Sequence, residues 1–301
     1  MSNPWIPSSS SGASGAPTVG TKPASVGFLG LSLAGGKTDK ACLSLLEYYP
    51  DQKRLFLSKI FEKIKSDSTI SADLKIHEII MQYQAQTKTI AVDIPWKLPL
   101  CLSCKLTCPG FENCNADHIQ WMWKWSEKNL QPKKPKKVFT PYTQRAAEMY
   151  LATELDERIV LPHVMGSNSA PLVARAAFIL RRLNIPAIEV HPRLTLWRLG
   201  SQLEVQKNHL RRHKHSVSGE DSRRTILAAL EEKNLAFVYA ADRKLMISNS
   251  HAFDSFLCAL TAFLEHMGYT EDKPADFPKD ESWINFPVKN VPWNKILLEN
   301  K

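Results

Sequence analysis

The fold is decided by three short apolar runs near the start of the chain, beginning with Ser25-Val-Gly-Phe-Leu-Gly-Leu-Ser-Leu-Ala34. Residues 35–39, with two glycines, read as a turn, and residues 41–49 form the second apolar run. Residues 50–52 form another turn before the third run at residues 53–60. Short apolar runs separated by tight turns are typical of antiparallel strands. The sequence therefore predicts a three-stranded antiparallel meander.

Helical and strand patterns alternate along the rest of the chain. Apolar residues recur at helical intervals over residues 71–84, and residues 89–94 form a continuous apolar run. Asn249 or Ser250 is expected to open the last helix, and Ser169 is expected to cap another. Further elements are predicted as helices at 145–155, 169–183, 218–233 and 250–266 and a strand at 187–190. This order predicts an α/β fold with a mixed sheet flanked by helices.

The composition favours a soluble, cytoplasmic protein. No run reaches the roughly 18–20 apolar residues of a membrane-spanning helix, so no membrane partner is expected. Residues 1–22 lack the basic and then apolar order of a signal peptide, and we expect a disordered tail. The chain has six cysteines, of which Cys42 and Cys258 are expected in the core. The net charge of +9 fits a polyanionic partner such as RNA or DNA.

Three carboxylates stand within apolar segments: Asp93, Glu189 and Asp254. An acid buried at the end of a strand costs several kcal/mol unless something compensates its charge. Magnesium or manganese held by carboxylates compensates that charge and also catalyses phosphodiester chemistry. The alternative for Asp254 is structural, because an acid in the first turns of a helix is favoured by the helix dipole alone.

The ordered segments resemble the RNase H-like fold and, more narrowly, a family of uncharacterised proteins described as predicted nucleases of that fold. The resemblance spans about residues 26–268. It is carried by Gly30-Leu-Ser-Leu-Ala34, Ala91-Val-Asp93-Ile-Pro95, Glu189-Val-His191-Pro192-Arg193 and Phe253-Asp254-Ser-Phe-Leu-Cys258-Ala-Leu-Thr-Ala262. It implies one domain over residues 23–270, a C-terminal extension at 271–301, and convergence of Asp93, Glu189 and Asp254 on divalent metal.

One position departs from the pattern of that family. The resemblance implies an aspartate in the first strand, in a Gly-x-Asp-x-Ala pattern, where this chain has Ser32. In RNase H-like enzymes that acid bridges both metals, and a serine hydroxyl is a poor substitute. Asp39, just past the first turn, is a candidate replacement, although its side chain could equally face water. His191 and Arg193 could contact phosphate or position water, or make structural hydrogen bonds.

Four cysteines lie within fourteen residues, in an insertion at residues 100–140 that is expected to be irregular. Cys101, Cys104, Cys108 and Cys114 have the close spacing that suits tetrahedral zinc, and His118 offers a variant with three cysteines and one histidine. An iron–sulfur cluster and a set of thiols without metal are the alternatives. Four thiolates leave no open coordination position, so a metal here is expected to be structural.

Two basic segments are candidates for contact with nucleic acid. Stacking of bases on tryptophan beside lysine–phosphate contacts is a common way of gripping single strands. The alternatives are that Trp121 and Trp125 cover the core, that the lysines form a solvated linker, and that residues 211–215, which are expected to be mobile, form a plain solvated loop. The candidate residues are Trp121, Trp123, Lys124, Lys133, Lys134, Lys136 and Lys137 in the first segment, Arg211, Arg212 and Lys214 in the second, and Arg193 between them.

The function expected from these features is that of a divalent-metal-dependent nuclease. The first alternative is a nucleic-acid-binding protein of the same fold that has lost catalysis through the change at Ser32. A third hypothesis is nucleotide binding, since residues 30–38 resemble the phosphate-binding hairpin of sugar kinases and actin-like ATPases. Those proteins need two such hairpins, and the sequence offers no second one.

Overall fold

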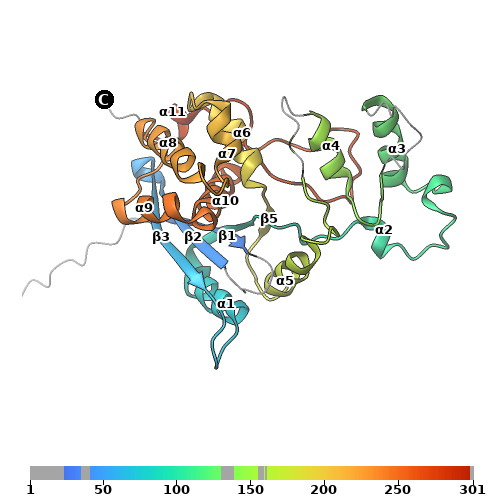
Figure 1. Ribbon diagram of the computed structural model, residues 1–301, viewed down its shortest axis with the longest axis horizontal. Coiled ribbons are helices and arrows are strands. Elements are labelled where there is room, and N and C mark those ends of the chain that lie inside the picture. Colours follow the sequence, from blue (N-terminus) through green and yellow to red (C-terminus); the bar gives the residue numbers. More distant parts are fainter. Residues whose placement is uncertain (1–23, 35–40, 130–138, 155–158, 160, 299–301) are drawn as a thin grey trace, which may run out of the picture.

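Five strands form one mixed sheet in the computed structural model, which describes residues 24–34, 41–129, 139–154, 159 and 161–298. The sheet has the order β3-β2-β1-β4-β5 (Figure 1). The first three strands are antiparallel, whereas β4 and β5 run parallel to β1. Their bounds are β1 Val26–Leu33, β2 Ala41–Tyr49, β3 Arg54–Ile64, β4 Thr87–Val92 and β5 Ala187–Glu189. The predicted antiparallel meander and the predicted mixed sheet are confirmed.

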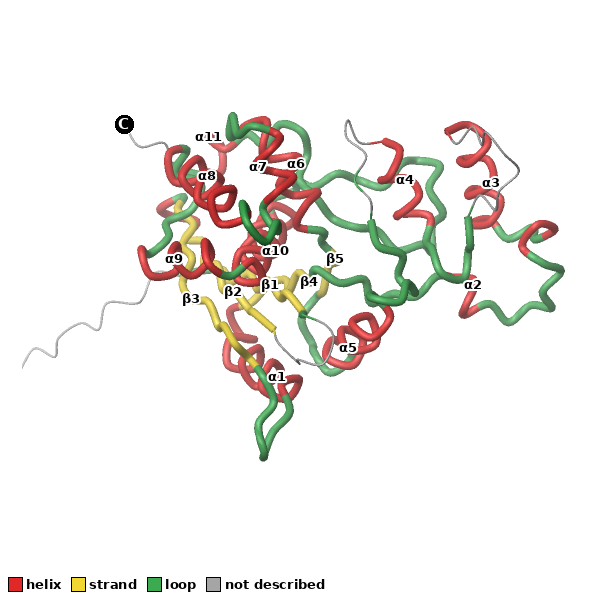
Figure 2. The backbone as a smooth tube through the Cα atoms, viewed as in Figure 1, coloured by secondary structure: helices red, strands yellow, loops and turns green. Residues whose placement is uncertain are grey.

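Helices cover both faces of the sheet (Figure 2). On one face, α1 (Ala72–Tyr83) and α5 (Ala170–Leu180) pack on the alternate residues of the central strands. On the other face lie α6 (Pro192–Gln202), α8 (Gly219–Glu232) and α10 (Ser250–His266). Strand β1 is buried along nearly its whole length because apolar residues contact helices on both sides of it. This burial explains why its sequence is continuously apolar rather than alternating.

Helix α10 lies directly against the centre of the sheet. Asn249 caps the helix, its side-chain oxygen accepting hydrogen bonds from the backbone N–H groups of His251 and Ala252, as the sequence predicts. A Cβ atom added at Gly30 would lie 2.0 Å from the carbonyl oxygen of Ser255 and 2.4 Å from the backbone nitrogen of Ala259. The helix backbone therefore touches strand β1 at Gly30. This contact sets the distance between α10 and the sheet, and with it the position of the side chains of α10.

The segment between β5 and α8 contains helices that the sequence did not predict; Arg211 and Arg212 end one of them, and residues 213–215 form a turn and loop beyond it. Helix α7 (Lys207–Arg212) packs the side chain of Leu210 against Gly200 of α6. Beyond the helix, the buried guanidinium of Arg223 donates a hydrogen bond to the carbonyl oxygen of His213. These contacts are with residues distant in sequence, so local patterns gave no sign of them. Helix α9 (Ala240–Ser248) was likewise not predicted.

The insertion between β4 and β5 also contains more regular structure than expected. It holds α2 (Leu100–Ser103) and α3 (Asp117–Asn129), and the helix predicted at residues 145–155 follows as α4 (Ala146–Glu154). The prediction of irregular structure is therefore wrong over residues 117–129. Helices α3 and α4 share a third apolar cluster with Phe277 and Phe286, while α11 (Trp293–Ile296) packs beside α6 and α10. No helix among the described residues is both long enough and apolar enough to cross a membrane.

Candidate functional site

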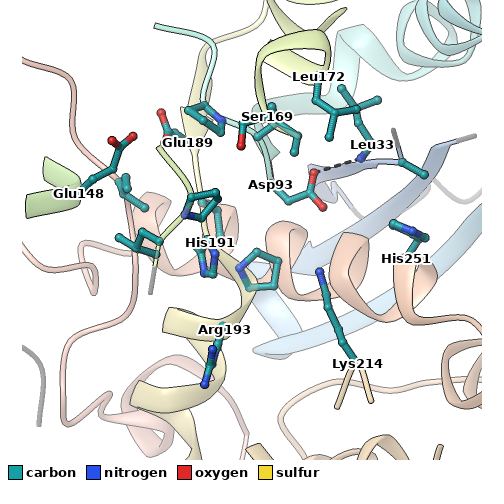
Figure 3. A pocket seen from close by; sticks show the side chains of 18 of the residues that line it. Leu33, Asp93, Glu148, Ser169, Leu172, Glu189, His191, Arg193, Lys214 and His251 are labelled. Atoms are coloured by element: carbon teal, nitrogen blue, oxygen red, sulfur yellow. Dashed lines mark hydrogen bonds between the residues drawn. The ribbon is translucent and has the colours of Figure 1, made fainter. Parts of the chain in front are cut away.

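A cavity of about 440 Å³ lies at the carboxyl ends of β4 and β5 (Figure 3). Parallel strands end together at this edge of the sheet, and α5 and α6 both begin beside it. Crevices at the carboxyl ends of parallel strands are common ligand sites, and helix N-termini favour anions. The polar residues that line the cavity are Asp93, Arg145, Glu148, Ser169, Glu189, His191, Arg193, Arg211, His213, Lys214 and His251.

Asp93 is held at the end of β4 by two hydrogen bonds from strand β1. The backbone N–H of Leu33 donates to Oδ1 at 3.0 Å, and the hydroxyl of Ser32 donates to Oδ2 at 2.6 Å. The same hydroxyl oxygen lies 3.1 Å from Nδ1 of His251. Burial raises the pKa of Asp93 to about 6; the nearby Lys214 opposes this shift, and the charge of Asp254 adds to it. Ser32 thus supports the carboxylate of Asp93 instead of supplying a second one.

Asp254 is fully buried on α10, and its charge is balanced by one lysine. The ammonium of Lys214 forms an ion pair with Oδ2 of Asp254, and the lysine side chain is 52% exposed. Burial alone would lower the pKa of Lys214, but the charges of Asp254 and Asp93 raise it. In Figure 3 the ammonium points toward Asp93. Lys214 therefore enters from the surface to stand beside the buried carboxylate of Asp254 and the partly buried carboxylate of Asp93.

The imidazole of His213 lies beside the carboxylate of Asp254. Its Nδ1 lies 2.9 Å from the carbonyl oxygen of Leu210, which can only accept, so Nδ1 carries the proton. Nε2 is then an unprotonated acceptor, 3.7 Å from Oδ1 of Asp254, and neither atom has a hydrogen-bond partner among the described residues. Burial lowers the pKa of His213 and therefore favours this neutral form. Two unsatisfied buried acceptors that face each other mark a place suited to a cation or a donor.

Glu189 ends β5 but is occupied by a buried arginine. Its two carboxylate oxygens accept hydrogen bonds from Nη1 and Nη2 of Arg145, at 2.7 and 2.6 Å. Nε of Arg145 donates to Glu148 at 2.9 Å, and Nη1 lies 3.4 Å from the carbonyl oxygen of Lys97. Burial raises the pKa of Glu148 to about 7; Arg145 opposes the shift and Glu189 adds to it. This triad, Arg145–Glu148–Glu189, fastens the insertion to the strand edge.

His191 completes the floor of the cavity, directly after β5. Burial lowers the pKa of His191 to about 3, and the positive charge of Lys214 lowers it further, so the ring is neutral. Its Nδ1 is buried and has no hydrogen-bond partner in the part of the chain that the structure describes. The imidazole therefore brings one polar nitrogen without a described partner to the cavity.

One protein family is similar in sequence to most of this chain. Residues 62–279 match the family described as protein of unknown function, DUF429, over well more than half of the chain. The chain belongs to the DUF429 family. Neither the curated proteins nor the solved structures contain a match to it. The matched region of this DUF429 protein includes Asp93, Glu189 and Asp254, but not strand β1 with Ser32.

The structure brings together only part of the predicted carboxylate set. Asp93 and Asp254 interact with each other and with Lys214, but only Asp93 of the two lines the cavity; Glu189 lines it as well, with both oxygens bound to Arg145. Asp39 lies outside the described residues. Sequence reasoning missed Arg145, Glu148, His213 and His251 as site residues. Arg145 opens a predicted helix, and nothing near it in sequence shows its partner, because Glu189 is 44 residues away.

The basic and aromatic candidates divide between separate places. Arg193, Arg211 and Lys214 line the cavity, and Arg212 is an exposed residue at the end of α7. Lys133, Lys134, Lys136 and Lys137 lie outside the described residues. Trp121 is buried and stacked on Trp125, with centroids 5.1 Å apart, and Trp123 donates from its indole nitrogen to the carbonyl oxygen of Phe111. Both Trp121 and the exposed Lys124 line a different hollow. Trp121 and Trp125 thus fill the core, the alternative left open by the sequence.

The remaining metal-ligand candidates are the cysteines. Cys42 and Cys258 are buried core residues, as predicted. The charges of Cys108, Cys104 and Cys114 add to the effect of burial in raising the pKa of Cys101, so the four thiols share one neighbourhood. Within the described part of the chain, no three His, Cys, Asp or Glu side chains are arranged to hold a metal ion together.

Proposed function

We propose that this DUF429 protein is a divalent-metal-dependent phosphodiesterase of RNase H-like fold that acts on nucleic acid. The observation that carries the proposal is a pair of carboxylates, the fully buried Asp254 and the partly buried Asp93, which face one ammonium at the edge of a basic cavity. Carboxylates in this position are the ligands that magnesium and manganese prefer. Perturbed titratable groups gathered in a cleft are also typical of a catalytic site.

The order of the elements supports this assignment of the fold. An antiparallel meander is followed by two strands parallel to the first, in the order β3-β2-β1-β4-β5, and α10 crosses the centre of the sheet. The resemblance drawn from the sequence implies this arrangement. It also implies acids at the end of β4, at the end of β5 and in the last long helix, where Asp93, Glu189 and Asp254 stand.

No three of the described His, Cys, Asp or Glu side chains are grouped to hold a metal ion as they stand, so a cation can bind here only if Lys214 moves aside and the carboxylates close on the ion. Oδ1 of Asp254 and Nε2 of His213 are buried acceptors without hydrogen-bond partners among the described residues. Each carboxylate oxygen of Asp93 accepts one hydrogen bond from the described chain. Because the side chain of Lys214 is half-exposed, its ammonium can withdraw into water without unpacking the core. Carboxylates with an imidazole nearby suit manganese better than magnesium. The ion, when bound, would stabilise charge on a phosphoryl oxygen and lower the pKa of a bound water.

The other residues of the cavity have roles that follow from their charge. Arg193, Arg211 and Lys214 can pair with phosphate oxygens, and the N-terminal ends of α5 and α6 add partial positive charge. The neutral ring of His191 can orient a water molecule by hydrogen bonding. The Arg145–Glu148–Glu189 triad holds the strand edge in place and contacts no phosphate in this scheme.

A second candidate is a nucleic-acid-binding protein without catalysis, and two specific observations favour it. The first strand carries Ser32 at the position where the family resemblance implies an aspartate. Lys214 already neutralises part of the charge that would attract metal. With serine in place of that aspartate, and with the ammonium of Lys214 already beside the carboxylates, the site holds fewer metal ions than a two-metal nuclease requires.

The test compares cleavage and binding in the same protein. Labelled single-stranded and double-stranded RNA and DNA are incubated with the full chain in manganese, in magnesium and in EDTA. We expect manganese-dependent cleavage that is lost in Asp93→Asn and kept in Asp221→Asn, an exposed aspartate on α8. Binding without cleavage in either metal would replace the first candidate by the second. If the chain neither binds nor cleaves nucleic acid, both are wrong.

A further inference from the structure

The insertion after β4 carries a group of four cysteines that the cavity does not use. Cys101 lies in α2, and Cys104 follows directly after that helix. Cys114 ends a turn of 3-10 helix at Phe111–Asn113, and Cys108 lies in the loop between the two turns. All four thiols are free; Cys104 and Cys108 are exposed, and the other two are partly buried.

Electrostatic coupling of Cys101 to the other three thiols shows that the four lie in one neighbourhood of the insertion. Cys101 and Cys104 are three residues apart across one helical turn, a spacing that places side chains on the same face. The chain then turns back at Gly110, which has the positive φ of 84° that favours glycine. Gln120 of α3 donates to the carbonyl oxygen of Cys114 at 2.7 Å and so fixes the return.

This part of the chain has little to stabilise it in the protein alone. Among the described contacts, residues 104–108 make no backbone hydrogen bond. Leu106 is 76% exposed, and the loop stands away from the rest of the molecule beside α2 (Figure 1). Ordering a residue costs about 1–2 kcal/mol of conformational entropy, and no apolar core around the described part of this loop offsets that cost. An ordered loop of this kind needs a cross-link.

We propose that Cys101, Cys104, Cys108 and Cys114 bind a structural zinc ion. Four thiolates match the tetrahedral geometry that zinc prefers in structural sites, and they leave no position for substrate. Because the described side chains are not grouped closely enough to act as ligands together, the loop has to close onto the ion. Closing is easy because residues 104–108 have no backbone hydrogen bonds to the described chain that would have to break. Zinc binding and local folding are therefore one event, with the thiols releasing their protons as they bind.

The position of the four cysteines in the fold indicates what a zinc ion bound there would stabilise. The insertion leaves β4 beside Lys97, whose carbonyl oxygen lies 3.4 Å from Nη1 of the cavity arginine, Arg145. At its other end, Phe111 stacks on Trp123 of α3, with ring centroids 6.0 Å apart. A zinc ion between these two anchors would brace the wall of the insertion without taking part in chemistry at the cavity.

The test measures metal in the full chain, purified under reducing conditions without chelator. We expect about one zinc ion per chain. After exchange for cobalt, we expect intense visible d–d bands and the charge-transfer band of thiolate ligands. Cys108→Ser removes one thiolate ligand and should lose the bound zinc. Because Cys108 is exposed, the mutation disturbs no core contact and should leave the fold intact. The matched control, Cys42→Ala, removes a buried thiol elsewhere and should keep it.

The possible outcomes separate the proposal from its alternatives. Metal-free protein with four reactive thiols overturns it, and so does a coloured iron–sulfur cluster in anaerobically purified protein. Zinc that is retained in both Cys108→Ser and Cys104→Ser places the ion somewhere else and also overturns it. The cobalt spectrum of the unaltered chain needs no variant, so the proposal stays testable even if a cysteine substitution prevents folding.

Discussion

The ammonium of Lys214 forms an ion pair with the buried carboxylate of Asp254, and the carboxylate of Asp93 lies within its electrostatic reach. A buried carboxylate without a partner is destabilising, so a cation of some kind is required here. A lysine that enters from the surface can supply that cation and can also give way to another one. Lys214 and a divalent metal are thus expected to compete for the same two carboxylates.

Replacing Lys214 by methionine tests this competition. Without metal, Lys214→Met should lower the free energy of unfolding by about 1–3 kcal/mol, because Asp254 loses its partner. Manganese at a concentration 100-fold above the Kd of the variant should then stabilise the variant by about 2.7 kcal/mol, and the unaltered chain by less. Chemical denaturation with and without manganese measures both effects. Lys233→Met, which removes an exposed pair with Glu204, is the control and should change neither.

An equal effect of manganese on Lys214→Met and on the unaltered chain would contradict competition. That result would mean that the metal, if it binds, binds away from the lysine.

Arg145 should be the most sensitive single position of the strand edge. Arg145→Met leaves Glu148 and Glu189 buried without their common partner and should cost about 3–5 kcal/mol of unfolding free energy. Arg145→Lys should rescue only a small part of this loss, because one ammonium cannot make the forked contacts of a guanidinium. Urea denaturation gives the values. Arg224→Met, on an exposed pair with Asp221, should change stability by less than about 1 kcal/mol.

The same triad predicts a dependence of stability on pH. The pKa of Glu148 is raised from 4.5 to about 7, so the folded protein holds this proton more tightly than the unfolded chain does. Its contribution to stability is fully present below pH 4.5 and is lost as the pH rises through about 7. Between these values, the unfolding free energy of the unaltered chain should fall relative to Glu148→Gln by up to about 3 kcal/mol.

The measurement is a series of denaturation curves at pH 4.5 to 7.5, taken side by side for the two proteins. Glu232→Gln, at an exposed position of α8, should run parallel to the unaltered chain. Parallel curves for Glu148→Gln as well would show that Glu148 does not titrate in this range.

The sequence predicts the sheet and the carboxylates of the site, but not the arginine and histidines that surround them. Strand β1 and the strand that ends at Asp93 are recognisable because burial on both faces forces continuous apolar runs. Asn249 is predictable as a helix cap because capping is a local contact. Arg145 and His213 were missed because their partners are brought to them by the tertiary fold, and no local pattern reports such contacts. The hydrogen bond from Ser32 to Asp93 likewise spans 61 residues.

The contact between Gly30 and α10 links the fold to the site. Gly30→Ala would place a methyl group 2.0 Å from the carbonyl oxygen of Ser255, so the helix has to move away from the sheet. We expect a loss of more than about 3 kcal/mol, because neither backbone can yield without repacking the core. Gly27→Ala, in the same strand with a closest approach of 3.1 Å, should cost less. Thermal unfolding of the two variants gives the comparison, and a larger loss in Gly27→Ala would contradict it.

The change at the first strand can be reversed, and the result separates the two candidate functions. Ser32→Asp places a third carboxylate beside Asp93 and removes the hydroxyl that donates to it at 2.6 Å. Without metal this variant should be less stable than Ser32→Ala, which loses the hydrogen bond but adds no charge. If the edge of the sheet is a cation site, manganese should stabilise Ser32→Asp more than Ser32→Ala, and any manganese-dependent cleavage should rise. If manganese leaves the unfolding curves of both variants unchanged, the carboxylates do not bind the ion, and the metal-dependent function proposed for this cavity is wrong.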